Sequence, residues 1–139
     1  MKLSVKTDYA CRAIVWMAQH YGEDHTVHVQ ALAAAQGIPE NYLVQILTVL
    51  RGAGFVKSKR GKDGGYYLAR PPGQISFGDV VRAVQGHVLD MPSLNDPHCP
   101  EGMKEVWGKI KRAAEQIADN VTFEDLVSAS EHGEGMFYI

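Results

Sequence analysis

Apolar residues recur at helical spacing in six stretches of this chain, and each stretch predicts a helix. In the third stretch, for example, Leu43, Ile46, Leu47 and Leu50 fall on one helical face. The predicted helices cover residues 7–21, 28–36, 39–52, 76–85 and 101–119, and a short sixth helix begins at Thr122. The pattern therefore predicts a mainly helical protein.

Residues that favour helix ends stand at several of the expected boundaries. Thr7 is the expected N-cap of the first helix, and Pro39 is expected in the first turn of the third. Two pairs have the spacing of a capping box: Ser76 with Asp79, and Thr122 with Asp125.

Two short β segments, at 55–59 and 66–69, interrupt the helical pattern after the third helix. The six residues between them, Arg60-Gly61-Lys62-Asp63-Gly64-Gly65, are expected to form a charged, glycine-rich hairpin tip. Further along, a glycine and three prolines within 86–100 predict an irregular loop. Loops of that length in compact domains are usually functional or disordered.

Length and composition narrow the class of protein. The 139 residues suffice for one domain or a small domain with an appended element, and 45% hydrophobic and 22% charged residues are ordinary for a folded protein. No apolar run approaches the roughly 20 residues of a membrane span, and the N-terminus lacks the apolar core of a secretion signal. Two cysteines, Cys11 and Cys99, cannot form a disulfide framework. We therefore expect a cytoplasmic protein with reduced thiols and no membrane partner.

Catalytic motifs are missing from the sequence. It contains no nucleophile elbow, no Walker loop, no GxGxxG that opens a helix and no zinc motif. We therefore expect no enzymatic activity.

The formal net charge of -2 hides an asymmetry between the two halves. Residues 1–70 carry nine basic and five acidic side chains, whereas residues 71–139 carry five basic and eleven acidic ones. The first half includes a stretch with five basic residues and no acid: Arg51, Lys57, Lys59, Arg60 and Lys62. Such a stretch fits a site for a polyanion, although charge alone would favour a solvated surface hairpin.

Two helices joined by a glycine turn and followed by a basic hairpin have the order of a winged helix-turn-helix. In that arrangement the helix at 39–52 lies in a DNA major groove, and the basic hairpin contacts phosphates or the minor groove. The candidate base-reading residues are Glu40, Asn41, Tyr42 and Gln45, because amides pair with adenine and carboxylates accept from cytosine. Periodicity alone does not separate this interpretation from a core helix with a polar outer face.

Three motifs along the chain follow a pattern shared by a known family. They are Met1-Lys2-Leu3-Ser4…Asp8-Tyr9-Ala10, then Tyr42-Leu43…Gln45-Ile46-Leu47…Leu50-Arg51…Gly54-Phe55-Val56, and Arg60-Gly61…Gly64-Gly65-Tyr66…Leu68-Ala69-Arg70. With them the sequence resembles the Rrf-two family of bacterial transcription regulators, and the similarity continues to the helix that carries Trp107. This family includes the iron–sulfur cluster regulator, the nitric-oxide-sensing repressor and the cysteine-metabolism repressor.

The resemblance implies a homodimer that binds a pseudo-palindromic operator with two reading helices and two wings. Arg60 matches the position of an arginine that the family places in the minor groove. In the family the long C-terminal helix crosses to the partner subunit and forms the dimer interface. Its residues would here be the apolar seam formed by Met103, Val106, Trp107, Ile110, Ala114 and Ile117.

Sensing members of the family hold an iron–sulfur cluster with three cysteines in the loop before the tryptophan helix. Here that loop contains one cysteine, Cys99, with Asp96 and His98 beside it, and Asp8 matches an acidic ligand that some members donate from the other subunit. Three interpretations stay open: a cluster-free regulator with a structural or redox-sensing Cys99, an atypical metal or cluster site at these four residues, or an ordinary solvated loop. One cysteine cannot supply three thiolates, so we favour the first and expect no cofactor.

We therefore predict a mainly α fold with a small β-hairpin wing. A winged helix-turn-helix domain is expected at 1–85, an effector or sensor loop at 86–100, and a dimerisation helix with a C-terminal segment at 101–139. The predicted function is transcription regulation by a homodimer on a double-stranded DNA operator, with an unidentified small-molecule or protein effector. The sequence does not separate activation from repression. The alternatives are a metal-dependent sensor and a winged-helix module that binds protein instead of DNA.

Overall fold

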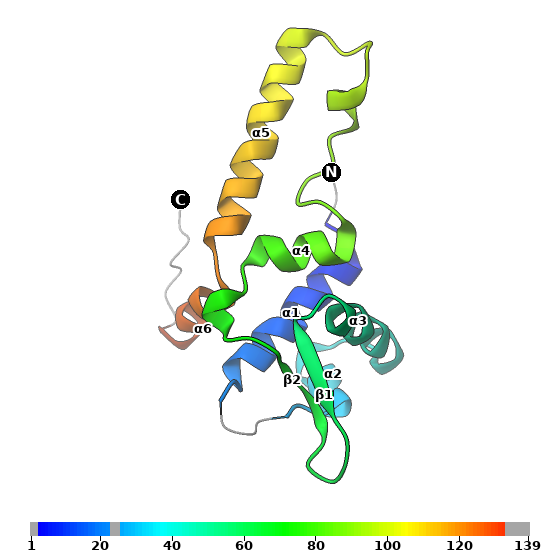
Figure 1. Ribbon diagram of the computed structural model, residues 1–139, viewed down its shortest axis with the longest axis vertical. Coiled ribbons are helices and arrows are strands. Elements are labelled where there is room, and N and C mark those ends of the chain that lie inside the picture. The colour runs from blue at the N-terminus through cyan, green and yellow to red at the C-terminus, as the bar shows by residue number, and fades with distance from the viewer. Residues whose placement is uncertain (1–2, 23–25, 133–139) are drawn as a thin grey trace.

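The computed structural model describes residues 3–22 and 26–132, and helices dominate this part of the chain (Figure 1). In chain order the elements are α1 (Val5–Gln19), α2 (Val29–Gln36), α3 (Glu40–Gly52), β1 (Val56–Lys59), β2 (Gly65–Leu68), η1 (Pro72–Gln74), α4 (Phe77–Gln85), η2 (Pro92–Asn95), α5 (Glu101–Asn120) and α6 (Phe123–His132). The predicted mainly α fold with a β-hairpin wing is confirmed. The last seven positions of the predicted C-terminal segment lie outside the described residues.

Helix α1 begins two residues earlier than predicted, because Ser4 and not Thr7 is its N-cap. Ser4 Oγ accepts a hydrogen bond from the Thr7 backbone nitrogen at 3.0 Å. Thr7 is fully buried, and its hydroxyl donates to Gln85 Oε1 at 2.8 Å. Gln85 Nε2 then donates to the His87 carbonyl at 2.8 Å. The expected cap at Thr7 is therefore wrong, and this residue instead connects α1 to the end of α4 and the loop behind it.

The other predicted helix ends differ by small amounts. Pro39 occupies the N-cap position before α3 and not its first turn. At the start of α6, the Asp125 nitrogen donates to Thr122 Oγ1 at 3.1 Å and the Thr122 nitrogen donates to Asp125 Oδ2 at 2.9 Å. This reciprocal pair confirms the capping box predicted there.

The wing is an antiparallel hairpin with an additional bridge on its second strand. Val56 pairs with Leu68 and Lys59 with Gly65 across the hairpin. On the other edge of β2, the Val27 nitrogen donates to the Tyr66 carbonyl at 2.7 Å, and the Tyr66 nitrogen donates to the Val27 carbonyl at 2.8 Å. The wing is thus attached to the segment between α1 and α2 as well as to α3.

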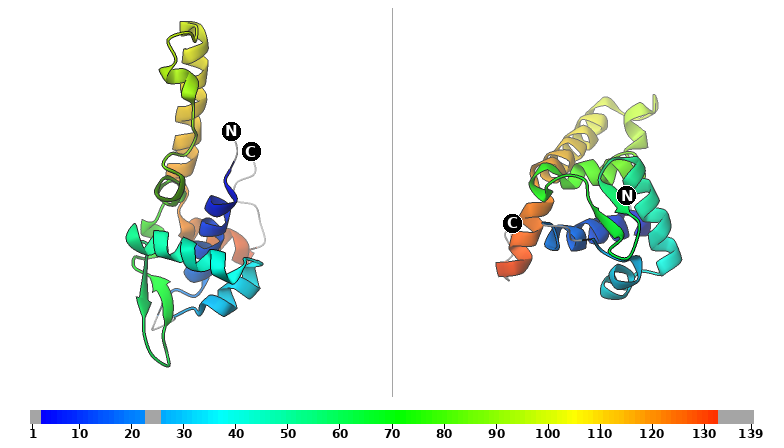
Figure 2. Two further views of the ribbon diagram at one scale, coloured as in Figure 1. Left: turned by 90° about the vertical axis from the view of Figure 1, so that its right-hand side faces the viewer. Right: turned by 60° about the horizontal axis from the view of Figure 1, so that its bottom comes forward.

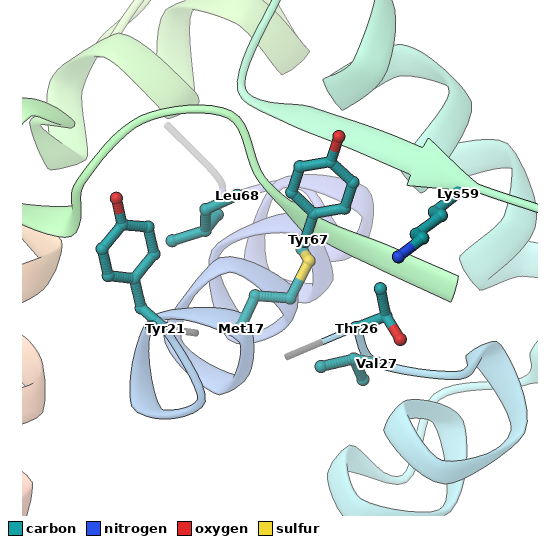
Figure 3. Close-up of a pocket in the computed structure, with 8 residues that line it drawn as sticks. Met17, Tyr21, Thr26, Val27, Lys59, Tyr67 and Leu68 are labelled. Atoms are coloured by element: carbon teal, nitrogen blue, oxygen red, sulfur yellow. The ribbon is translucent and has the colours of Figure 1, made fainter. Parts of the chain in front are cut away.

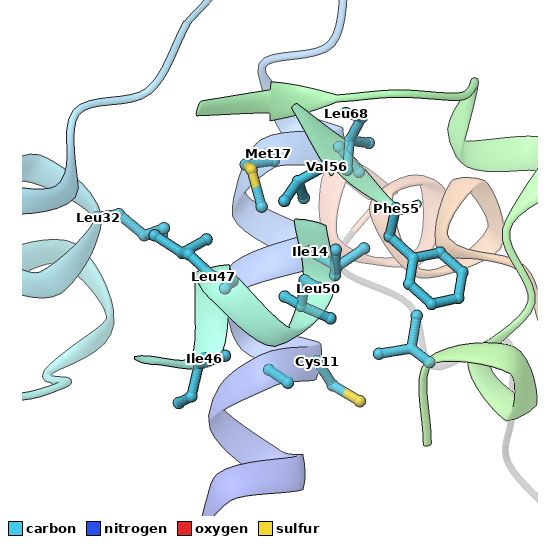
Figure 4. Packing of buried hydrophobic residues seen from close by; sticks show 14 of the residues in the cluster. Cys11, Ile14, Met17, Leu32, Ile46, Leu47, Leu50, Phe55, Val56 and Leu68 are labelled. Carbon is cyan, nitrogen blue, oxygen red and sulfur yellow. The ribbon is translucent and has the colours of Figure 1, made fainter. Parts of the chain in front are cut away.

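Helix α1 lies at the centre of the hydrophobic core, against α3, α4 and α6 (Figure 4). Its residues Ile14 and Met17 meet apolar side chains from α3 and from both strands of the wing. Cys11 is also part of this core, and burial, followed by the nearby Asp8 carboxylate, raises the pKa of its thiol to about 12. Cys11 is therefore a buried thiol of the core.

Helix α5 projects from this core at the end of the molecule opposite the wing (Figures 1 and 2). The loop at 86–100 runs outward, α5 returns, and α6 packs back on α1. Phe123 of α6 is fully buried, and its nitrogen donates to the Ile75 carbonyl at 3.1 Å. Arg82 of α4 holds the base of α5 through two hydrogen bonds to the Asp119 carboxylate, of 2.6 and 2.9 Å. Within the described residues, no helix combines the length and apolar character needed to cross a bilayer.

Candidate nucleic-acid interface

Helix α3 has one face in the core and one face in solvent. Leu43, Ile46, Leu47 and Leu50 are all fully buried, as their spacing predicts. The opposite face exposes three of the predicted base-reading residues, Glu40, Asn41 and Gln45. Polar side chains at the N-terminal end of an exposed helix are what a major-groove reading helix requires.

Tyr42, the fourth predicted reading residue, is half-buried and differs from the other three. Its ring meets the Tyr9 ring of α1 edge-on, with centroids 5.8 Å apart and planes at 81°. The Arg12 guanidinium lies 5.5 Å from the Tyr9 centroid and forms a 2.8 Å ion pair with Asp8. The beginning of α1 therefore supports the reading end of α3. The sequence pattern did not assign Tyr9 or Arg12 to this surface, although Tyr9 belongs to the N-terminal motif Asp8-Tyr9-Ala10.

An open depression of about 480 Å³ lies between these two helices. Val5 and Tyr9 of α1 line one side, and Asn41, Tyr42 and Gln45 line the other. The surface beside the reading residues is thus concave.

The wing presents its four predicted cations, Lys57, Lys59, Arg60 and Lys62, as exposed side chains. None of the ion pairs found among the described residues involves them. The fifth residue of the basic stretch, Arg51, is at the end of α3 and donates from Nη1 to Ser58 Oγ of β1 at 3.3 Å. This contact links the reading helix to the wing, so the structure brings the predicted α3 and wing residues together on adjacent elements.

Helix α5 has two distinct faces. Gly108 and Ala118 are buried, Gly108 beside the Arg112 side chain of the same helix, and Trp107 and Ala114 are half-buried. A second face is apolar and exposed: Met103 is 48%, Val106 56%, Ile110 41% and Ile117 62% accessible. The predicted seam therefore consists mainly of side chains that this chain does not cover. Among the described residues, Trp107 Nε1 is the one buried side-chain nitrogen or oxygen without a hydrogen-bond partner.

The candidate metal or redox residues of the loop make local backbone contacts. Asp96 Oδ1 accepts from the His98 nitrogen at 2.9 Å, and the half-buried Cys99 has its Sγ 3.7 Å from the Pro100 carbonyl. Asp8, the fourth candidate, pairs with Arg12 on α1. Over 3–22 and 26–132, no three His, Cys, Asp or Glu side chains lie close enough together to hold a metal ion. A site shared between two subunits stays one of the open alternatives, and the absence of a cofactor stays the prediction.

Comparisons with known proteins agree with this geometry. Residues 3–129 match the Rrf2 family, described as an iron-dependent transcriptional regulator. The chain is 36% identical to the HTH-type transcriptional regulator CymR of Bacillus subtilis over 141 residues, which span both proteins completely. Among solved structures, CymR, the global cysteine regulator of B. subtilis, superposes with a TM-score of 0.83 at 31% identity, covering 92% of this chain and 97% of that one. IscR of T. potens superposes with a TM-score of 0.82 at 37% identity, covering 99% and 97%.

These similarities cover the reading helix, the wing and α5 together. The relatives are transcription regulators and not enzymes, which confirms the expectation that this chain has no catalytic role. The chain belongs to the Rrf2 family and is a DNA-binding, winged-helix transcriptional regulator.

Proposed function

We propose that two copies of this chain pair through α5 and bind a pseudo-palindromic operator in double-stranded DNA. The observation that carries this proposal is the apolar face of α5, which is exposed while a different face of the same helix packs on its own chain. We also propose that the protein is cytoplasmic, because the bacterial DNA that would carry the operator lies in the cytoplasm.

A second copy of α5 is the occupant that fits this face. Met103, Val106, Ile110 and Ile117 recur every three, four and seven residues, which is the spacing of a helix–helix seam. Contiguous exposed apolar residues on a projecting helix mark an interaction surface. A two-fold axis through α5 would make the surface self-complementary and would place two reading helices symmetrically, as a pseudo-palindrome needs.

Each subunit would read DNA with α3 and hold the backbone with its wing. Asn41 and Gln45 are exposed and suit bidentate bonds to adenine. The wing cations suit phosphate contacts, and Arg60 at the tip suits the minor groove. Tyr42, packed on Tyr9, would position the helix more than read bases.

For the signal, we propose a regulator without the three-thiolate cluster, since 86–100 contains one cysteine. Oxidation of Cys99 would then be a route to reshape the loop that leads into α5. Anaerobic purification with iron and acid-labile sulfide assays tests this point. A colourless, metal-free protein that binds DNA is expected, and stoichiometric iron and sulfide would contradict it.

The dimer is tested by light scattering after size exclusion, with Ile110→Asp beside Lys109→Asp. Both put an aspartate on the exposed surface of α5, but only the first lies in the apolar seam. We expect the wild type and Lys109→Asp to have twice the chain mass and Ile110→Asp to have the chain mass. A dimeric Ile110→Asp protein would contradict pairing through this seam.

The DNA interface is tested on duplexes selected from a random pool by the wild-type protein. Arg60→Ala should weaken binding and reduce the slope of log K against log salt by about two, because one cationic contact is lost from each of the two wings of the dimer. An unchanged affinity and slope would exclude contact by Arg60.

A further inference from the structure

A cavity of about 650 Å³ lies where the end of α1 meets the wing, away from the reading face of α3 (Figure 3). Met17 and Tyr21 line it from α1, Val27 from the bridging segment, and Lys59 and Leu68 from the two strands of the wing. Its volume is within the range of about 300–1,000 Å³ that is typical of small-molecule sites.

The lining divides into an apolar floor and a polar, cationic rim. Met17, Val27 and Leu68 are 2%, 7% and 5% exposed and form the floor. Tyr67 contributes a phenol, and Figure 3 shows the Lys59 ammonium directed from its strand back toward the space beside Thr26. An apolar floor with a few polar groups, one of them a cation, selects a molecule with an apolar body and an anionic head.

We propose that this cavity binds an amphipathic organic anion, with a carboxylate or sulfonate at Lys59 and an aliphatic or aromatic body against Met17, Val27 and Leu68. A bond from an ammonium to an anionic oxygen is among the stronger hydrogen bonds in proteins. The site requires no metal and does not involve Cys99, so it is separate from the loop at 86–100.

The position of the cavity couples its occupant to DNA binding, and this consequence rests on the proposed function. Lys59 is also one of the cations that would contact phosphates, so an anion that pairs with it removes one contact from each wing. The opposite wall is attached to the wing as well, because Thr26 Oγ1 donates to the Asp63 carbonyl at 2.9 Å and Val27 pairs with Tyr66. The bound anion therefore weakens operator binding.

The binding site is tested with 8-anilinonaphthalene-1-sulfonate, an aromatic sulfonate whose fluorescence rises in apolar surroundings. Lys59→Gln is compared with Lys57→Gln, which removes a cation from the same strand but does not line the cavity. We expect saturable binding of one dye per chain, weakened about tenfold by Lys59→Gln and unchanged by Lys57→Gln. Equal affinities for both variants would overturn the proposal.

A site-resolved readout uses protein labelled with ¹³C at the methionine methyl groups. The dye, and decanoate in a second titration, should shift the Met17 resonance, assigned with Met17→Leu, and leave those of Met91 and Met103 in place. Met103 is the sensitive control, because it lies in the apolar seam of α5 and would report dye or decanoate that enters that seam. A shift of Met103 without one of Met17 would overturn the proposal.

A DNA-binding experiment distinguishes failure of this ligand site from failure of the proposed function. Saturating decanoate should reduce the salt slope of wild-type DNA binding by about two, one contact for each wing of the dimer, and should leave the slope of Lys59→Gln unchanged. If the dye binds as expected but the protein binds no DNA, the site stands and the proposed function fails. If DNA binding is normal and Lys59→Gln binds the dye as the wild type does, the site fails alone.

Discussion

Replacing Gly65 with alanine tests how the wing is attached to the rest of the fold. Gly65 has φ +146°, a conformation that L residues rarely adopt, and a Cβ at this position would lie 2.7 Å from the Val27 carbonyl oxygen. That oxygen accepts from the Tyr66 nitrogen in the bridge between Val27 and β2. An alanine therefore strains its own backbone and pushes the bridging segment away from the wing. Gly61→Ala is the matched control, since Gly61 has φ +106° with nothing within 4 Å of its added Cβ.

The two substitutions should differ in unfolding free energy by the contribution of the backbone bridge between Val27 and Tyr66. Backbone strain of a residue in a sparsely populated region costs about 1–3 kcal/mol, and both variants bear it. Gly65→Ala in addition weakens two backbone hydrogen bonds, of 2.7 and 2.8 Å, each contributing about 1 kcal/mol. We therefore expect Gly65→Ala to lower the free energy of unfolding by about 2 kcal/mol more than Gly61→Ala does. Both proteins should remain folded, because domains are stable by about 5–15 kcal/mol.

Urea unfolding followed by far-ultraviolet circular dichroism measures this difference. Hydrogen exchange at the Val27 and Tyr66 amides localises it, and both amides should exchange faster in Gly65→Ala than in Gly61→Ala. Equal unfolding free energies for the two variants, with equal protection of these amides, would refute the reasoning that Val27 supports the wing.

Three further predictions concern α5, the two thiols and the buried threonine. The Arg82 hydrogen bond holds the pKa of the Asp119 carboxyl below its usual value, so its stabilisation is present above a pH of about 3.9 and is lost as pH falls through the lowered pKa. The urea midpoints of wild type and Asp119→Asn should differ at pH 7, and the difference should shrink as the pH is lowered below about 3.9; a constant difference would contradict this. Burial raises the pKa of the Cys11 thiol to about 12, so Ellman's reagent at pH 8 should modify only Cys99 in the folded chain and both cysteines in urea. Rapid reaction of both cysteines without urea would instead show that Cys11 is accessible. Thr7→Val keeps the side-chain shape but leaves Gln85 Oε1 without its donor, so unfolding should become easier by about 1–3 kcal/mol, whereas no loss of stability would mean that water replaces the hydroxyl.

The secondary structure was predictable because each element depends on local chemistry. The burial of Leu43, Ile46, Leu47 and Leu50 follows from helical spacing, and the cap at Thr122 follows from contacts three residues apart. Thr7 marks where such reasoning stops. Its hydroxyl contacts the neighbouring Ser4 hydroxyl at 2.6 Å and also donates to Gln85, which is 78 residues away. The second bond depends on the packing of α1 on α4, which local sequence does not reveal.

The residues of the candidate interface likewise fall into those that local sequence could predict and those that depend on tertiary packing. Residue type and order were enough to predict a wing with exposed cations next to a helix with exposed amides, and the structure places these side chains on adjacent elements. They could not separate Tyr42, which packs on Tyr9, from its exposed neighbours Asn41 and Gln45. They also could not reveal the cavity beside the wing, because Met17, Val27 and Lys59 come from three segments that meet only in the folded chain.

The apolar residues of α5 show why the family resemblance was needed to interpret them. A stripe at helical spacing indicates burial, and from the spacing alone it would be assigned to the core of a single chain. The structure instead buries Ala118 and also Gly108, which the Arg112 side chain of the same helix covers, and leaves the larger Met103, Val106, Ile110 and Ile117 in solvent. The Arg82–Asp119 contact holds the base of α5 on its own chain, whereas the large residues provide the apolar area that stabilises an association. This division of one helix between intrachain packing and an open apolar seam is the physical reason to expect that folding of the monomer and pairing of two monomers are separable, and that Ile110→Asp abolishes only the second.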